Sequence, residues 1–430
     1  SPMTSLLLYA LFPRVKRKEL TSFTIKVLLF DEPLANLDPA AGRSTIELID
    51  LVHERTGAAV IIIEHRLEDV LWRSMDRIVL MNEGRIVADM PTARLLAGRQ
   101  LIEHGIREPL YLTALRYAGV EVSEALHPEH VDHLILTEEQ KAKVRRWYED
   151  RRTVSRHKSD AEALLQAEHL TFGYTPEVRT LQDVSFTIHK GEMVSIVGRN
   201  GAGKSTLAKL ICGFEQPAAG KISMEGRDLS GDTIKERAAR IGYVMQNPNQ
   251  MISKPMIWDE VEMALVQSGM PLEERKQRVE ETLKVCGLYP FRNWPVSALS
   301  FGQKKRVTIA SILVQRPQII ILDEPTAGQD YHHYTEIMEF LRELNQRGYT
   351  ILMITHDMHL MLEYTPRAIV FSEGRMLADT TAAHVLNDPE LVQAANLKET
   401  SLYTLSIACG IDEPQSFTEC FIEYEQKEGR

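Results

Sequence analysis

One short segment has the glycine spacing and the cation of a phosphate-binding loop. The pattern Gly198-x-x-x-x-Gly203-Lys204-Ser205 follows the apolar run Met193–Val197 and precedes a helical pattern through Leu207 and Leu210. Glycines let a backbone wrap around phosphates so that successive N–H groups point at them. We therefore expect Lys204 to neutralise the terminal phosphates of a nucleotide and Ser205 to ligate Mg²⁺. The residues expected to contact the nucleotide here are Gly198, Asn200, Gly201, Gly203, Lys204, Ser205 and Thr206.

An acidic pair forms a second candidate site. Asp323 and Glu324 follow Ile319–Leu322, a continuous apolar run typical of a buried parallel strand. Ligands of α/β sheets bind at the carboxyl ends of such strands. Asp323 would then hold the Mg²⁺ shell, and Glu324 would act as general base on an attacking water. His356 follows the apolar run Ile351–Ile354 and would reach the γ-phosphate from the same edge; the alternative is a structural histidine.

The chain repeats three motifs in the same order. The matched pairs are Val27–Pro33 with Ile319–Pro325, Val60–His65 with Ile351–His356, and Asn82–Asp89 with Ser372–Asp379. Their separations are 292, 291 and 290 residues, so the order and the spacing are nearly constant. We therefore expect one domain type to occur twice. Residues 106–120 also faintly resemble residues 397–411, which predicts a similar helical extension after each copy.

The first copy is predicted to be incomplete at its N-terminal side. Measured from Asp31, a counterpart of the phosphate loop would fall before residue 1, and nothing in residues 1–26 resembles one. The chain is then either a fragment or a degenerate gene product, and the intact half-motifs favour a fragment. The expected division is residues 1–26 unassigned, 27–100 the C-terminal part of the first domain, 101–160 a helical extension and linker, 161–395 the complete second domain, and 396–430 a C-terminal helical extension.

The composition is that of a globular protein rather than a disordered or membrane-spanning one. Of 430 residues, 44% are hydrophobic and 26% charged, which excludes a wholly disordered chain. A net charge of −10 disfavours binding to nucleic acid through bulk electrostatics. Apolar runs such as Leu6–Phe12 are far shorter than the ~20 residues of a membrane-spanning helix. Four cysteines without C-x-x-C spacing favour a reducing compartment, which makes the cytosol the expected location.

Across roughly residues 165–390 the second copy resembles the nucleotide-binding domain of an ABC ATPase, an α/β P-loop fold with a mixed sheet core and a helical subdomain. The resemblance rests on the phosphate loop, the acidic pair, and Leu299-Ser-Phe-Gly-Gln303, which is similar to the family's signature motif. It implies that Ser300, Phe301, Gly302 and Gln303 meet the γ-phosphate of a nucleotide held by a facing domain. It further implies roles for Tyr174 in stacking on adenine, for Gln246 (the Q-loop) in binding Mg²⁺, for Asp330 in the D-loop, and for His356 as the switch histidine.

Two departures from the family pattern stand out. Phe301 occupies a signature position where most members have glycine. The segment Ala327–Asp330 differs from the usual D-loop sequence but keeps Asp330. In the first copy the equivalents are Asp31, Glu32, Asp38 and His65, without a phosphate loop, Q-loop or signature. Neither composite site could then close within one chain, so hydrolysis would need a second chain or a complete partner domain.

Within the family, the segments around Gln246, Phe301 and Asp330 resemble energy-coupling factor (ECF) importers, most of all the duplicated ATPase for hydroxymethylpyrimidine or thiamine uptake. This implies ATP and Mg²⁺ as cofactors, a transmembrane energising subunit and a substrate-binding membrane subunit as partners, and a peripheral place at the cytoplasmic face of the membrane. Two alternatives stay open: a soluble duplicated ABC protein acting on ribosomes or DNA, and a catalytically incomplete structural subunit. The −10 charge and the two switch histidines favour transport.

Overall fold

The computed structural model describes residues 26–35, 37–82, 84–152, 161–175, 177–327, 329 and 331–427. Residues 1–25, nearly all of the unassigned N-terminal segment, lie outside this part of the chain. The chain divides into two compact units: unit 1 contains residues 1–151 and 401–414, and unit 2 contains residues 152–400 and 415–430. The polypeptide therefore passes from one unit to the other three times.

Unit 2 is built on a six-stranded mixed sheet. Its strands, in spatial order, are β10 (Ile241–Val244), β11 (Ile319–Asp323), β12 (Thr350–Ile354), β7 (Met193–Gly198), β13 (Arg367–Ser372) and β14 (Arg375–Thr381). All neighbours pair in parallel except β13 and β14. The continuous apolar runs of β7, β11 and β12 are buried, as expected for parallel strands covered on both faces. This sheet confirms the predicted fold class.

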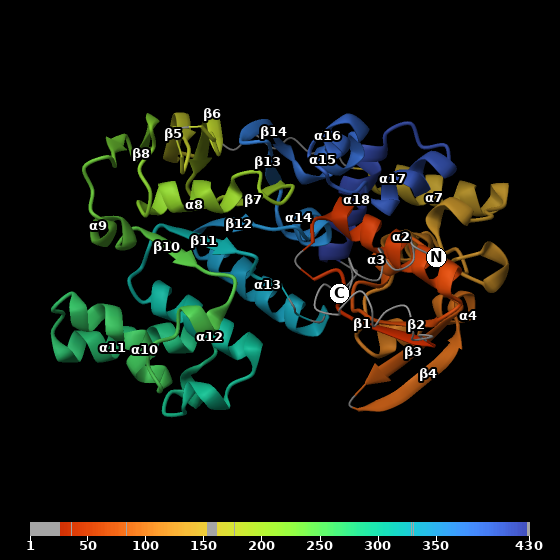
Figure 1. Cartoon of the computed structure of the whole chain (residues 1–430), viewed down its shortest axis with the longest axis horizontal. Coiled ribbons are helices and arrows are strands. Elements are labelled where there is room, and N and C mark those ends of the chain that lie inside the picture. Colours follow the sequence, from red (N-terminus) through yellow and green to blue (C-terminus); the bar gives the residue numbers. More distant parts are fainter. Residues whose placement is uncertain are drawn as a thin grey trace, which may run out of the picture. The chain divides into compact units, whose positions relative to one another are not determined.

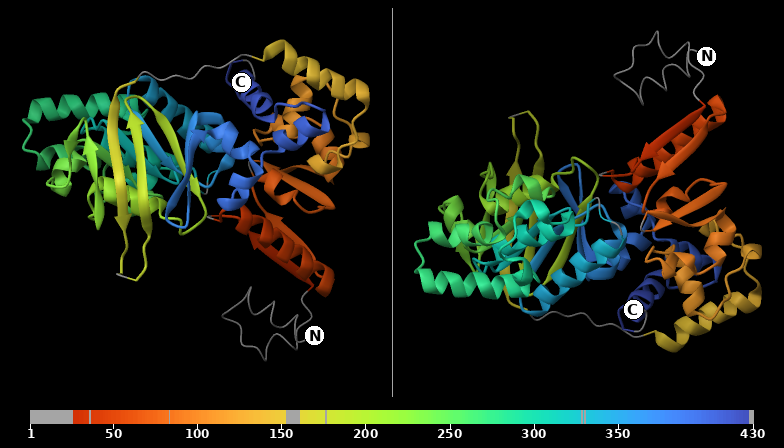
Figure 2. Two further views of the ribbon diagram at one scale, coloured as in Figure 1. Left: turned by 90° about the horizontal axis from the view of Figure 1, so that it is seen from above. Right: turned by 90° about the horizontal axis from the view of Figure 1, so that it is seen from below.

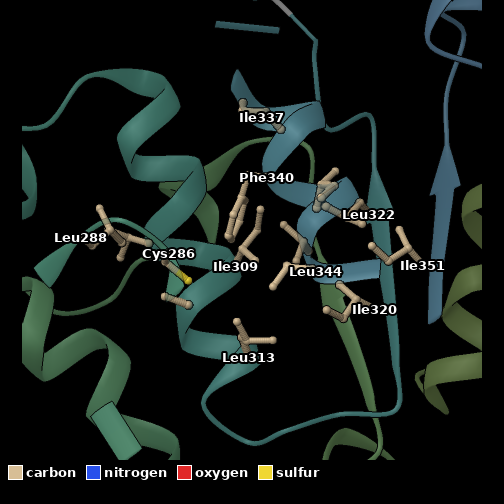
Figure 3. Packing of buried hydrophobic residues seen from close by; sticks show 14 of the residues in the cluster. Cys286, Leu288, Ile309, Leu313, Ile320, Leu322, Ile337, Phe340, Leu344 and Ile351 are labelled. Atoms are coloured by element: carbon tan, nitrogen blue, oxygen red, sulfur yellow. The ribbon is translucent and has the colours of Figure 1, made fainter. Parts of the chain in front are cut away.

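Different layers cover the two faces of this sheet (Figure 1). On one face α8 (Lys204–Cys212) packs together with a four-stranded antiparallel sheet, and on the other face lie α12 (Phe301–Leu313) and α13 (Tyr331–Gln346). Figure 3 shows the second layer, in which Phe340 and Leu344 of α13 pack against Ile320 and Leu322 of β11. The antiparallel sheet has the order β6 (Leu181–His189), β5 (Ala163–Phe172), β8 (Ala219–Met224) and β9 (Arg227–Asp228).

The remaining helices of unit 2 extend these layers. They are α9 (Ile234–Ala238), α10 (Ile257–Gln267), α11 (Leu272–Val285), α14 (Met358–Tyr364), α15 (Ala382–Asn387), α16 (Pro389–Ala394) and most of α18 (Pro414–Lys427). Helices α10, α11 and α12 pack on one another and form the helical part of the unit.

Unit 1 contains two small sheets. A parallel pair joins β1 (Val27–Asp31) and β2 (Ala59–Ile63), and an antiparallel pair joins β3 (Arg77–Asn82) and β4 (Arg85–Pro91). Helix α2 (Pro39–Thr56) lies along one face of the β1–β2 pair (Figure 2). The other helices of this unit are α3 (Leu67–Val70), α4 (Thr92–Ala97), α5 (Gln100–Glu103), α6 (Leu110–Tyr117), α7 (Glu138–Arg151) and α17 (Ser401–Ala408).

The strand pair β1–β2 has the same register as its repeat partner β11–β12. Leu29 lies opposite Ile61, and their counterparts Ile321 and Leu352 lie opposite each other. One face of β1–β2 is covered by Ile46, Ile49 and Val52 of α2, at the positions of buried residues of α13. Internal geometry is therefore shared by the two repeated segments.

The opposite face of β1–β2 is exposed. Val27, Leu29, Ile61 and Ile63 are 55%, 62%, 51% and 50% exposed. Their counterparts in the repeat, Ile319, Ile321, Leu352 and Ile354, are at most 1% exposed and pack in the cluster that contains α8. These four large apolar side chains form an exposed apolar face on β1–β2. The equivalent face of β11–β12 is buried.

This contrast yields a prediction for stability. Ile354→Ala should cost about 3 kcal/mol of unfolding free energy because it leaves a cavity in a packed core. The matched change Ile63→Ala, at the equivalent position, should cost less than about 1 kcal/mol because half of that side chain already contacts water. Denaturant unfolding of the two variants measures both costs. Equal losses would contradict the different burial of the two strand pairs.

The helices after the two repeated segments pack together within unit 1. Helix α17 contacts α6, to which it corresponds in the repeat, and a glycine with φ near +70° lies two residues after the end of each helix (Gly119 and Gly410). Helix α7 closes the group: Arg145 donates to the carbonyl oxygen of Cys409 at 2.6 Å, and Tyr148 donates to Glu413 at 2.9 Å. Helices α6, α7 and α17 thus form one small helical cluster, whereas most of α18, in the same predicted C-terminal extension as α17, belongs to unit 2.

Candidate active site

The phosphate loop lies between β7 and α8, where the sequence predicts it. Gly198, Gly201 and Gly203 have φ values of 138°, 80° and 102°, which disfavour any residue with a side chain. A Cβ atom on Gly198 would lie 1.9 Å from the carbonyl oxygen of Phe371 in the neighbouring strand β13. The loop conformation therefore requires glycine at the start of the motif for reasons of space as well as torsion.

Lys204 begins α8 and is 6% exposed. Its ammonium donates to the carbonyl oxygens of Gly198 at 2.7 Å and Arg199 at 2.9 Å, so the charge is held within the loop itself. Phosphate oxygens are stronger acceptors for an ammonium than neutral carbonyls. The loop thus keeps one cation close to a helix N-terminus, the arrangement that binds phosphate.

The acidic pair lies at the carboxyl end of β11, as predicted. The Oδ2 atom of Asp323 accepts a hydrogen bond of 2.8 Å from the hydroxyl of Tyr243 on the neighbouring strand β10. Glu324 follows with φ +47°, and its backbone N–H donates to Ile354 at the end of β12. A positive φ costs a glutamate of order 1 kcal/mol or more, and such strained residues cluster at functional sites.

The pKa of Glu324 is raised to about 8. Burial is the largest cause, the negative charge of Asp323 raises the pKa further, and the positive charge of Lys204 lowers it. A carboxyl group whose pKa lies near neutrality is suited to accept a proton from water. Oxygen donors such as the carboxylate of Asp323 are also the ligands that Mg²⁺ prefers, so the residues present fit this ion.

His356 lies beside Glu324. Its Nε2 atom is 3.1 Å from Oε1 of Glu324, and its backbone N–H donates to Oε2 at 3.4 Å. Thr355 extends the pairing of β12 with β7, and Asp357 caps α14 through the N–H groups of His359 and Leu360. The histidine is therefore fixed at the same sheet edge as the phosphate loop and the acidic pair.

Tyr174 lies near the first turn of α8. Its hydroxyl is 3.4 Å from that of Thr206, and Lys209 lies 5.6 Å from the centre of its ring. The ring is 54% exposed and contacts Phe172 edge-on. An exposed aromatic face beside the phosphate loop is compatible with the predicted stacking on adenine.

The signature segment forms the start of α12. Ser300 and Gln303 make a reciprocal capping box, with distances of 3.0 and 3.3 Å. Phe301 is 41% exposed, and a Cβ atom on Gly302 would make only ordinary contacts. The described surroundings of position 302 therefore leave space for a Cβ atom, and the predicted role of Gly302 in contacting a nucleotide stays a prediction.

Two polar side chains near the site, one partly buried and one buried, were not identified from the sequence. Tyr243 orients Asp323, and Lys305, 1% exposed on α12, donates to the backbone carbonyls of Met245 and Gln246. Burial lowers the pKa of Lys305 to about 8, although the charges of Asp323 and Glu324 oppose this shift. Lys305 follows the signature segment by two residues, but its partners could not be predicted because they depend on how α12 packs against the segment after β10.

The other predicted residues differ in how they are placed. Gln246 follows β10 with its side chain exposed, and Ser205 is exposed at the start of α8. Asp330 lies outside the described residues, while its neighbour Gln329 is buried. The roles of all these residues remain predictions.

The equivalent residues of unit 1 form a looser group. Glu32 repeats the positive φ of its counterpart, at +45°, and its N–H donates to Ile63. His65 lies 3.9 Å from Glu32, with side-chain exposures of 30% and 43%, against 14% and 15% for His356 and Glu324. Asp31 is exposed, whereas Asp38 is buried and caps α2. Among the described residues, this part of unit 1 has the same backbone conformation as its counterpart in unit 2. Its histidine and glutamate side chains, however, are farther apart and more exposed.

Three family profiles match the chain. One, described as ABC transporter, matches residues 181–327; a second, described as ATP-binding cassette cobalt transporter, matches residues 99–172. A third, described as AAA domain, putative AbiEii toxin, Type IV TA system, matches residues 292–363 and overlaps the first. No helix in the described ranges is long and apolar enough to cross a bilayer.

Curated relatives and solved structures agree with the first profile. Putative ABC transporter ATP-binding proteins of Clostridium perfringens and Enterococcus faecalis are 55% and 57% identical, each over 94% of this chain and 70% of its own length. The structure of cbiO1 from Clostridium perfringens, part of the ABC transporter complex cbiONQ, covers 55% of this chain and 95% of its own length. It is 33% identical, with a TM-score of 0.51.

Proposed function

Because this chain belongs to the family of ABC transporter ATP-binding proteins, we propose that it hydrolyses ATP to ADP and phosphate to drive an ECF-type importer. The single observation that carries the proposal is the convergence of three groups at one sheet edge. These are the Lys204 loop after β7, the acidic pair after β11, and His356 after β12. They supply a phosphate site, a base and an orienting imidazole.

In this proposal each residue has a defined task. Lys204 and the loop N–H groups bind the phosphates, and the Tyr174 ring supports the adenine. Glu324 takes the proton of the attacking water, while His356 holds the Glu324 carboxylate in place. Mg²⁺, when bound by Ser205, Asp323 and Gln246, would offset the charge of the phosphates.

We further propose that the chain carries one ABC domain type twice, with the second copy catalytic. The equal registers of β1–β2 and β11–β12, and the similar positive φ of Glu32 and Glu324, support the duplication. The wider separation and greater exposure of Glu32 and His65 support the proposal that only the second copy is catalytic. The signature residues Ser300–Gln303, and Asp330, would then complete a site on a facing nucleotide-binding domain, either another chain or a complete partner.

The proposed place of this chain is the cytoplasmic face of the membrane, on a transmembrane energising subunit beside a substrate-binding membrane subunit. The solved relative that is part of a cbiONQ complex supports such an assembly. We propose a vitamin as the substrate, such as thiamine or its hydroxymethylpyrimidine precursor. The description of the second profile makes cobalt ion the second candidate.

Affinity purification of the chain from its native membranes tests the proposal. We expect membrane subunits to co-purify in detergent, and uptake of one of the two substrate classes in reconstituted vesicles to require ATP on the side of this chain. A Glu324→Gln complex should assemble but not transport. Co-purification with ribosomes or DNA in place of membrane subunits would contradict transport, and full uptake with Glu324→Gln would indicate a structural subunit.

A further inference from the structure

Lys305 is an unusual residue in the second copy because a lysine is almost fully buried there without a carboxylate as its hydrogen-bond acceptor. It is 1% exposed, and its ammonium donates to the carbonyl oxygens of Met245 at 3.1 Å and Gln246 at 2.5 Å. Fully buried lysines are rare because removing the charge from water is costly. Here the charge is held by two backbone dipoles of one loop.

That loop also makes local contacts of its own. It follows β10 and leads into η3 (Pro248–Gln250), a single short turn. The N–H of Met245 contacts the sulfur atom of Met251, a weak acceptor, and Asn247 caps the turn locally. Hydrogen bonds from a charged donor are about twice as strong as those between neutral groups. Lys305 therefore makes two strong hydrogen bonds that tie the backbone of the Gln246 loop to α12.

The same lysine lies on the helix that begins with the signature segment. Ser300 caps α12, and Lys305 lies little more than one helical turn further on, where α12 packs against β10 and η3. A rigid helix thus joins the Ser300–Gln303 segment to the loop that carries Gln246. Any shift of the start of α12 would move the two carbonyl acceptors as well.

We propose that Lys305 is a positioning residue that holds the Gln246 loop on the signature helix, so that Gln246 is placed to bind Mg²⁺ beside Asp323. The inference rests on the proposed function, because it assigns Lys305 a task only in Mg–ATP binding. Lys305 acts through Gln246 and does not touch the nucleotide. Its removal should weaken the contribution of Mg²⁺ to ATP binding rather than ATP binding in general.

Calorimetric titration of the full chain with ATP, with Mg²⁺ and with EDTA, tests the proposal without requiring hydrolysis. Lys305→Met keeps an unbranched side chain, one atom shorter than that of lysine, but removes its donors. The gain in ATP affinity on adding Mg²⁺ should be about tenfold smaller in this variant than in wild type. Its affinity for ATP in EDTA should differ from that of wild type by less than twofold. Lys304→Met, one residue earlier on the same helix, is the matched control and should behave as wild type.

A double-mutant cycle separates positioning from a general structural role. If Lys305 acts only through Gln246, the variant Lys305→Met with Gln246→Ala should lose no more Mg²⁺ dependence than Gln246→Ala alone. Additive losses would overturn the proposal, and so would an unchanged Mg²⁺ dependence in Lys305→Met. A wild-type chain that bound no ATP would overturn the proposed function together with this inference.

Hydrogen exchange provides a second measurement that does not depend on ligand. The backbone N–H groups of residues 245–247 and 249–252 should exchange at least about fivefold faster in Lys305→Gln, which is shorter and uncharged, while those of β11 stay unchanged. This variant also keeps the test open if Lys305→Met folds poorly. Equal exchange of the loop in both proteins would show that Lys305 does not anchor it.

Discussion

Replacing Lys204 by alanine is expected to lower the affinity of the chain for Mg–ATP by more than about 100-fold. The side chain is buried and its ammonium is already held inside the phosphate loop, 2.7 Å from the carbonyl oxygen of Gly198. Its loss removes the lysine of the motif and leaves the phosphate charges mainly to the neutral N–H donors of the loop. Titration with a labelled ATP analogue measures the change.

Lys221→Ala provides the control for the loss of one positive charge. This lysine lies on β8, is 54% exposed and pairs with Glu168, so its removal should alter ATP affinity less than twofold. If Lys204→Ala bound Mg–ATP as tightly as Lys221→Ala, the phosphate loop would not be the nucleotide site.

Replacing Glu324 by glutamine is expected to reduce ATP turnover by about 10²- to 10³-fold while leaving ATP binding intact, because a carboxamide cannot accept the proton of the attacking water. The substitution should also stabilise the ligand-free chain at alkaline pH. The folded state raises the pKa of Glu324 from its ordinary value to about 8, so folded protein binds the proton more tightly than unfolded protein does. The free energy of unfolding of the wild-type chain therefore falls as pH rises from the ordinary pKa of a glutamate to about 8.

Glutamine carries no such charge, so the variant should melt at least ~2 °C higher than wild type at pH 8.5 and at nearly the same temperature at pH 4. Phosphate release and melting curves at the two pH values measure both effects. Glu32→Gln makes the same change at the repeated position, and we expect it to reduce turnover less than twofold. A similar loss in both variants would contradict the proposal that only the second copy is catalytic.

The strand ends that carry the candidate site could be predicted from the sequence because each signal is local. A glycine-rich turn between an apolar run and a helix, and acids or a histidine after an apolar run, define their own positions on a parallel sheet. Gly198, Glu324 and His356 therefore lie where the sequence predicts them.

Tyr243 and Lys305 could not be identified in this way. Their importance arises from the pairing of β10 with β11 and from the packing of α12 on β10, contacts between segments about 60 to 80 residues apart. A tyrosine in a strand or a lysine in a helix carries no local sign of such a partner. The exposure of Leu29 and Ile61 could not be predicted either, because their strands have the same apolar pattern as the buried pair β11–β12.

The three passages of the chain between units 1 and 2 have a consequence for chain integrity. A single cut of the chain after α7 would give one fragment of residues 1–151 and a second fragment with the remaining residues. Residues 401–414 belong to unit 1 but would be part of the second fragment. The α6–α17 contact and the hydrogen bond from Arg145 to Cys409 would then join the two fragments without a peptide bond. We therefore expect two separately expressed pieces, cut after residue 151, to associate through the contacts of α17 with α6 and α7.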